Sequence, residues 1–371
     1  MKIVYCIPGV FASGGTERVV INKANYLVNQ GYEVIIITTD QNGRAPFFAL
    51  DKRVIHYDLG INYFLNAKRN PLYKIFYFVW NRILHKCKLR ELLLTLKADV
   101  VVSMYMNEMS ILPEINDGSK KILEFHFSRP FFKINRRSGM MGLMDMIQNK
   151  LDIAHISKYE KFIVLTEEDK ENWAELTNVH VIYNASSIKG IHSSDEGDVI
   201  AVGRLTYQKG FDRLIDVWAK VHTDRKLRIY GDGELREVLN AKIKSMCLED
   251  RISIEMPTRD ILSVYSNASL LVMTSLYEGL PMVMIEAQSC GLPVISFDFP
   301  CGPKDVINDG IDGYIICNGD VEAMAEKITK LMNDDSIRIE MGKNAKKNSA
   351  RFDVDYIMSQ WCELFNDINV S

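Results

Sequence analysis

The sequence predicts an α/β protein built from two doubly wound domains, and three observations carry this prediction. The chain has 371 residues, which is too long for one ordinary hydrophobic core and typical of two domains. Short, unbroken apolar segments alternate with longer amphipathic ones, as in parallel sheets that helices cover on both faces. The alternation occurs twice, once on each side of a polar, Ser- and Gly-rich stretch.

The apolar segments expected to form strands fall into two series. The first series is Ile3–Ile7, Val34–Thr38, Val100–Ser103, Lys121–Phe125 and Phe162–Leu165. The second series is Val199–Val202, Leu227–Tyr230, Leu270–Met273, Val294–Phe297 and Tyr314–Cys317. We therefore expect domains at residues 1–185 and 198–353, a linker at 186–197, and a last helix at 354–371 that returns to the first domain.

The composition indicates a soluble globular protein and does not favour nucleic-acid binding, because the net charge is −3. Lys and Arg outnumber Asp and Glu by 24 to 19 in residues 1–185, whereas acidic residues lead by 29 to 21 in residues 186–371. The seven cysteines are scattered, and neither a signal peptide nor an apolar run long enough to span a membrane is evident. We therefore expect a cytoplasmic protein.

The segment Ser275–Glu286 carries the most informative pattern. It follows an apolar strand and enters a helix with Pro281 near its start, where free amides and the helix dipole suit an anion. Two carboxylates, Glu278 and Glu286, flank this anion site and match a ligand with both phosphates and hydroxyl pairs, such as a nucleotide-sugar. The amides expected to be free belong to Leu280, Met282 and Val283.

Arg204 and Lys209 follow the first strand of the second series. Five positions apart at a strand end, the guanidinium and ammonium groups are suited to gripping a diphosphate. The alternative is a pair of solvated surface cations. The segment at 275–286 favours the diphosphate interpretation, because its carboxylates need a counter-charge.

Two glycine-containing turns also follow expected strands. Gly14 and Gly15 allow a backbone to approach a ligand at a helix start, although Thr16 as a helix N-cap would explain the same turn. The turn Gly231–Gly233 would leave room for a flat base, although Asp232 could equally cap the next helix.

His126 follows the strand Lys121–Phe125, where it would reach a sugar hydroxyl or a phosphate oxygen; a structural histidine is the alternative. Asp353 and Asp355 spell a D-x-D sequence, but they open an expected helix and are interpreted as structural. We therefore expect no metal site.

Basic residues alternate with aromatic ones over residues 68–90. This pattern is typical of a helix that lies on anionic lipid headgroups. A surface helix with its apolar face in the core is the alternative. The excess of positive charge in the first half favours the membrane interpretation.

Several segments together resemble the retaining glycosyltransferases of GT-B fold and family 4 type. They are GGTER at 14–18, VGRLTYQKG at 202–210, YGDGEL at 230–235, EGLPMVMIEAQSCGLPVI at 278–295 and PCGPKDVINDGIDGYII at 300–316, the last resembling bacterial surface-polysaccharide enzymes. The resemblance covers nearly the whole chain and implies two Rossmann-like domains facing across a cleft. The first domain would bind the acceptor and the second the nucleotide-sugar.

The resemblance also implies a role for each candidate residue. Glu278, with the Gly279 and Leu280 amides nearby, would bind the donor sugar and Glu286 the ribose. His126 would be the active-site histidine, and the turn Gly231–Gly233 would lie beside the base. The donor diphosphate would be bound by Gly14, Gly15, Arg204 and Lys209.

The function expected from this resemblance is retaining, metal-independent transfer of a hexosyl or N-acetylhexosaminyl group. The donor would be UDP-linked, and the acceptor a lipid-linked saccharide at the inner face of the cell membrane. A nucleotide-sugar epimerase, a phosphorylase and a non-catalytic nucleotide-sugar-binding protein remain as alternatives on the same fold.

Overall fold

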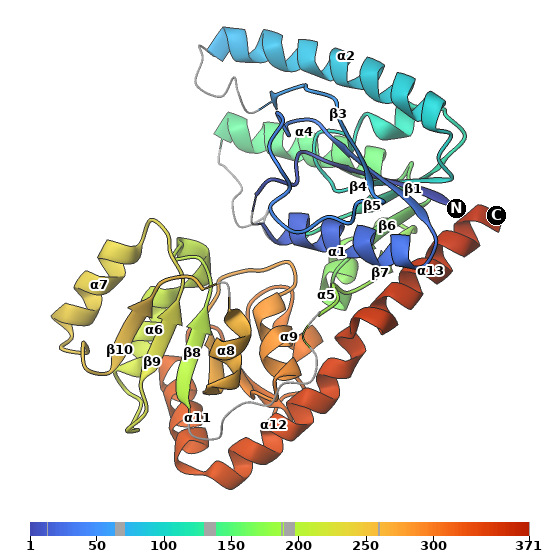
Figure 1. Ribbon diagram of the computed structural model, residues 1–371. Helices are drawn as coiled ribbons and strands as arrows, with labels where there is room; N and C mark the ends of the chain where they lie inside the picture. Colours follow the sequence, from blue (N-terminus) through green and yellow to red (C-terminus); the bar gives the residue numbers. More distant parts are fainter. Residues whose placement is uncertain are drawn as a thin grey trace.

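The computed structural model describes residues 1–12, 14–63, 71–129, 139–186, 188, 197–258 and 260–370. It contains two α/β domains, each built on one parallel sheet, and a long helix that runs from the second domain back to the first (Figure 1). The expected linker at 186–197 lies outside the described residues, apart from Ser186, Ile188 and Gly197.

The first sheet has seven parallel strands in the order β3-β2-β1-β4-β5-β6-β7. Its strands are β1 Lys2–Ile7, β2 Glu33–Thr38, β3 Ile55–Asp58, β4 Val100–Ser103, β5 Lys120–Glu124, β6 Lys161–Val164 and β7 Val179–Val181. Its helices are α1 Gly15–Asn29, α2 Pro71–Leu96, α4 Gly139–Ile156 and α5 Glu167–Asn172, with a 3-10 turn at Leu112–Glu114.

The second sheet has six parallel strands in the order β10-β9-β8-β11-β12-β13. Its strands are β8 Asp198–Val202, β9 Leu227–Tyr230, β10 Ile252–Glu255, β11 Ala268–Met273, β12 Val294–Phe297 and β13 Gly313–Ile316. Its helices are α6 Phe211–Trp218, α7 Arg236–Ser245, α8 Ile261–Ser266, α9 Met282–Ser289, α10 Pro303–Val306, α11 Val321–Asn333 and α12 Asp335–Ser349, with 3-10 turns at Tyr207–Lys209 and Ala350–Phe352.

Side chains along each strand point alternately to the two faces of the sheet, so both sheets have a hydrophobic core on each face. In β1, Ile3 and Tyr5 join the core beneath α1, whereas Val4 and Cys6 join the core beneath α2. Successive strand side chains point to opposite faces, so an uninterrupted apolar strand requires helices on both. The sequence-based prediction of two doubly wound α/β domains is therefore confirmed.

The last described helix, α13 Val354–Val370, packs on the first domain although it follows the second domain in the chain. Trp361 and Phe365 lie fully buried in the core that contains Ile3 and Tyr5 of β1. Figure 1 shows this helix, in red, running from α12 to a point beside the N-terminus.

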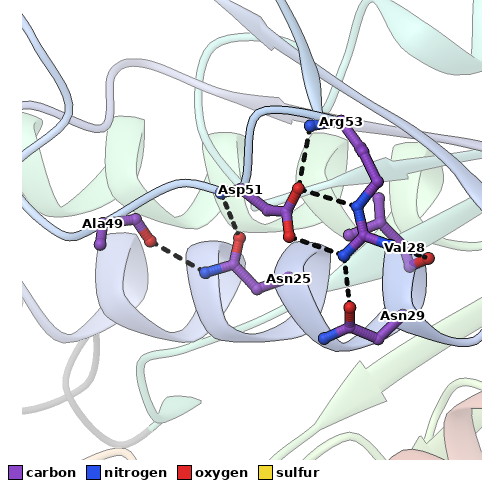
Figure 2. Close-up of polar contacts among 6 residues, drawn as sticks. All are labelled: Asn25, Val28, Asn29, Ala49, Asp51 and Arg53. Atoms are coloured by element: carbon purple, nitrogen blue, oxygen red, sulfur yellow. Dashed lines mark hydrogen bonds and ion pairs between the residues drawn. The ribbon is translucent and has the colours of Figure 1, made fainter.

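The outer side of α1 is fastened to the loop that precedes β3 (Figure 2). Asn25 donates to the Ala49 carbonyl at 2.9 Å and accepts from the Asp51 amide at 2.8 Å. Arg53 donates to Asp51 at 2.9 Å and also to Asn29, one turn further along α1. These bonds fix the position of α1, whose other end contributes to the site described below.

Candidate active site

The loops after β8 and β11 meet because these strands are neighbours at the point where the strand order of the second sheet reverses. Ligands of doubly wound sheets bind beyond the carboxyl ends of the strands at such a point. There the Lys209 ammonium lies 2.6 Å from the Glu278 carboxylate, which also accepts from the Ser275 hydroxyl at 2.8 Å. Gln208 donates to the Tyr277 carbonyl at 3.0 Å and so joins the two loops. The structure thus brings Lys209 and Glu278 together.

Helix α9 begins immediately after this pair. Pro281 is its N-cap residue and makes no side-chain capping bond, and Met282 is the first helical residue. The amides of Met282 and Val283 are therefore in the first turn, where a helix offers no backbone acceptor. Leu280, just before the helix, is a buried core residue. The helix thus presents its positive end close to Glu278.

Glu286 lies in the middle of α9 and is buried, with both carboxylate oxygens engaged by protein groups. Arg18, from the first domain, donates to one oxygen at 3.1 Å, and the Tyr265 hydroxyl donates to the other at 2.8 Å. Burial raises the pKa of Glu286, while the Arg18 charge and the Tyr265 hydrogen bond oppose that rise. Sequence reasoning identified Glu286 but neither of its partners.

Gly14 and Gly15 open helix α1, which carries Arg18 toward the second domain. The helix begins at Gly15 with Gly14 as N-cap, and no side chain caps it. The alternative interpretation of Thr16 as N-cap is therefore wrong, because the helix starts one residue before it. The Gly14 carbonyl instead accepts the Arg18 amide at 3.1 Å and so completes the first turn.

His126 follows β5 and contacts both its own domain and the second one. Its Nε2 lies 2.9 Å from Oε1 of Glu124, a fully buried carboxylate that also pairs with the Lys23 ammonium. A Cβ placed on Gly279 would lie only 2.4 Å from the His126 carbonyl oxygen. Only glycine permits this backbone approach, so position 279 couples the loops after β5 and β11.

The turn after β9 packs directly on the loop after β8. A Cβ on Gly231 would lie 1.9 Å from the Gly203 carbonyl oxygen. Asp232 accepts from Arg236 at 2.8 Å, and Leu235 is the N-cap of α7, so the capping interpretation of Asp232 is wrong.

Arg204 is exposed and makes no ion pair within the described part of the chain.

Asp353 and Asp355 form a helix start, as the sequence analysis expected. The Asp355 amide donates to the Asp353 carboxylate at 2.9 Å, and the Ile357 amide donates to the Asp353 carbonyl. Among the described residues there is no cluster of three or more His, Cys, Asp or Glu side chains suited to a metal ion.

Helices α2 and α4 each expose many large apolar side chains to solvent. We call this set the α2–α4 apolar surface; it comprises Phe76, Phe78, Val79, Trp80, Ile83, Met141, Leu143, Met144, Met146, Ile147 and Leu151. Leu89 and Leu93, toward the end of α2, are buried in the core instead. The core-helix alternative therefore describes the second half of α2, whereas the apolar side chains at 76, 78–80 and 83 are exposed. Of the predicted basic residues, Lys68 and Arg69 lie outside the described residues.

Within the described chain, no helix combines the length and apolarity that crossing a bilayer requires.

The fold and the site define a class of protein, the GT-B glycosyltransferases, and comparisons with known proteins support it. The model "Glycosyltransferase Family 4" matches residues 13–187, and "Glycosyl transferases group 1" matches residues 185–348. The chain is 31% identical to the amylovoran biosynthesis glycosyltransferase AmsD of Erwinia amylovora, over 98% of this chain and 99% of AmsD. The chain therefore belongs to the glycosyl transferases group 1 family.

Two further comparisons describe proteins that this chain is similar to. It is 26% identical, over 99% of both chains, to a Campylobacter jejuni alpha-1,4-N-acetyl-D-galactosaminyltransferase named for a PP-undecaprenol-linked saccharide. A solved structure of an S. aureus TarM variant in complex with UDP superposes with a TM-score of 0.79 at 19% identity, over 98% of this chain and 99% of that one. This likeness supports the GT-B fold.

Proposed function

We propose that the protein is a retaining, metal-independent glycosyltransferase of surface-polysaccharide biosynthesis. It moves a hexosyl or N-acetylhexosaminyl group from a UDP-linked donor to a lipid-linked saccharide. The observation that carries the proposal is the Lys209–Glu278 pair beside the first turn of α9, at the reversal point of the second sheet. The names of the polysaccharide enzymes similar to this chain, and the UDP bound to TarM, support the donor and acceptor classes.

The donor would lie across this point with its diphosphate at the first turn of α9. Lys209, Arg204 and the free amides supply positive charge where the leaving diphosphate gains negative charge, which is the task that a metal performs in other transferases. Glu278 accepts hydrogen bonds from sugar hydroxyls, and Glu286 accepts from the ribose with the lone pairs that Arg18 and Tyr265 leave free. The turn at Gly231–Asp232 lies beside the base.

The acceptor hydroxyl would enter from the first domain, beside His126, and attack on the face that the diphosphate leaves. This geometry preserves the anomeric configuration. The close approach of Gly279 to the His126 carbonyl supports the proposal, because it brings an acceptor-side residue next to the Glu278 turn. Contact between the domains also excludes water, which would otherwise hydrolyse the donor.

We also propose that the α2–α4 apolar surface lies on an anionic bilayer. Trp80 and Phe76 are 56% and 68% exposed, a costly arrangement in water but a favourable one among acyl chains. The excess of Lys and Arg in residues 1–185 would attract anionic headgroups. A membrane-bound first domain would place its site where a lipid-linked acceptor is found.

The test combines ligand binding with transfer. A thermal-shift screen of nucleotides and nucleotide-sugars identifies the donor, and transfer to synthetic lipid-linked saccharides is then followed by mass spectrometry and by NMR of the new anomeric proton. Glu278→Gln and Lys209→Met are expected to lower transfer by about a hundredfold or more. Unchanged transfer in either variant, an inverted anomer, or formation of an epimer or a sugar phosphate instead would refute the proposal.

A further inference from the structure

Three charged or polar side chains, those of Lys23, His126 and Glu124, contact one another in a buried cluster behind the candidate active site. The Lys23 ammonium and the His126 Nε2 both contact the same oxygen, Oε1 of Glu124. Their side chains are 5%, 4% and 1% exposed, in that order, so water contributes almost nothing to the arrangement. Lys23 comes from α1, whereas Glu124 and His126 come from the end of β5.

The far side of Lys23 is fixed by the returning helix α13. Its ammonium lies 3.5 Å from the centre of the Trp361 ring, a cation–π contact that is strongest where water is excluded. Lys23 is therefore held between the Glu124 carboxylate and the Trp361 ring. An element that follows the whole second domain in the chain thus supports the residues behind His126.

The charges of Lys23 and Glu124 depend on the contacts within this buried cluster. Burial lowers the pKa of Lys23, to about 8, and Glu124 opposes that change. Burial alone would raise the pKa of Glu124, but the charges of Lys23 and His126, together with their hydrogen bonds, outweigh it and lower that pKa. Glu124 is therefore an ionised carboxylate, which can only accept hydrogen bonds. The hydrogen between Glu124 and His126 must belong to Nε2 of the ring.

We propose that Glu124 is a positioning residue that holds His126 in its Nε2–H tautomer and leaves Nδ1 as the atom that engages substrate. Nδ1 has no hydrogen-bond partner in the described part of the chain and is not fully buried. In the neutral ring it carries a lone pair, and it can accept a hydrogen bond from an acceptor or donor hydroxyl. The Lys23 ammonium, which contacts the same carboxylate oxygen, helps to keep Glu124 ionised.

This inference rests on the proposed role of His126 in sugar transfer. A purely structural ion pair between α1 and β5 is the competing explanation. That explanation predicts that changes at Glu124 alter stability alone, whereas positioning predicts a change in the protonation pattern of His126 and in kcat. The experiment therefore measures both the protonation pattern of His126 and kcat.

The direct measurement is 15N NMR of the full chain labelled at histidine, with the His126 signals assigned by their loss in His126→Asn. We expect the Nε2–H tautomer in the unaltered protein and a mixture of tautomers in Glu124→Gln, whose neutral amide can either donate or accept. An Nδ1–H tautomer in the unaltered protein would overturn the proposal.

Kinetics supply the second readout. Glu124→Gln is expected to lower kcat by about tenfold or more with the KM for the donor within about twofold, as expected when a catalytic group is misoriented. If Glu124→Gln alone does not fold, the double variant Lys23→Met with Glu124→Gln leaves no unpaired charge in the core. This double variant should show the same loss of kcat. Trp361→Phe retains a ring beneath Lys23 and should keep both the tautomer and kcat. Unchanged tautomer and kcat in the Glu124 variants would overturn the proposal.

The two readouts separate this inference from the proposed function. The NMR measurement needs no substrate, so it decides the tautomer even if no sugar transfer is found. If the tautomer is as expected but His126→Asn retains full transfer, the role of His126 in the proposed function fails, and the positioning role of Glu124 fails with it.

Discussion

The Arg18 guanidinium donates to the Glu286 carboxylate at 3.1 Å, across the boundary between the two domains. Glu286 is the residue proposed to bind the ribose, and it is buried in the second domain. The second-domain part of the candidate site is thus completed by a cation from the first domain. If Glu286 binds the ribose as proposed, this ion pair links donor binding to the contact between the domains.

Arg18→Met is expected to weaken UDP binding by about tenfold, because a charge-assisted bond is lost and Glu286 then gains a proton more readily. Isothermal titration with UDP measures the effect directly. Tyr265→Phe is the matched control, since it removes the other bond to Glu286 while leaving the Arg18 charge, and it should have a smaller effect. Equal UDP affinity in Arg18→Met and the unaltered protein would contradict the proposed role.

Gly279→Ala is expected to lower transfer by about a hundredfold while the melting temperature stays nearly constant. The new methyl group would lie 2.4 Å from the His126 carbonyl and would push the two loops apart, and small displacements of reacting groups are costly. Gly342→Ala makes a matched comparison, because its methyl group would meet the Gly291 carbonyl at 2.3 Å within the second domain. That variant should lose stability instead. A fully active Gly279→Ala would argue against close contact of the loops.

Glu108→Gln is expected to stabilise the protein at pH 8 by about 1–3 kcal/mol and to change little at pH 5. Burial raises the pKa of Glu108 to about 7, although hydrogen bonds from Ser103 and backbone amides oppose this. Between the unfolded pKa, about 4.3, and pH 7 the folded protein keeps a proton that the unfolded chain has lost, so stability falls as pH rises. Urea unfolding at both pH values measures this. The exposed Glu249→Gln is the control, and an equal effect there would disprove the assignment.

Trp80→Ser combined with Leu143→Ser is expected to reduce binding to phosphatidylglycerol vesicles by about tenfold or more, because apolar area is lost from the α2–α4 apolar surface. Sedimentation with the vesicles measures binding, and transfer to a lipid-free acceptor should be unaffected. Val238→Ser removes a similarly exposed side chain from the second domain and serves as control. If the variants bind vesicles equally well, the membrane is not the partner of this surface.

The fold could be predicted from the sequence wherever strands are buried on both faces. Such strands read as unbroken apolar segments, and all ten predicted strands were found with bounds shifted by at most two residues. The strands that the sequence analysis missed, β3, β7 and β10, all lie at sheet edges. An edge strand is partly exposed, so its polar side chains interrupt the apolar pattern that a central strand requires.

The candidate site could be proposed from the sequence where its residues are concentrated in one segment, as at Ser275–Glu286, and not where the fold assembles it from distant segments. Lys23 looks like an ordinary helix-surface lysine, although its position three residues after Val20 and four before Leu27 places it on the apolar face of α1. Glu124, a carboxylate that directly follows the apolar residues Ile122 and Leu123 in β5, was a similar unused signal. Their pairing, and that of Arg18 with Glu286, depends on the tertiary arrangement.

The return of α13 to the first domain also sets a constraint on how this protein is made. Trp361 and Phe365 complete the core around Ile3 and Tyr5, yet they are translated only after every residue of the second domain. A nascent chain must therefore leave the part of this apolar face that α1 does not cover exposed while the ribosome adds the second domain. Chaperone binding to that face during synthesis, and its release when α13 emerges, would follow from this order of events.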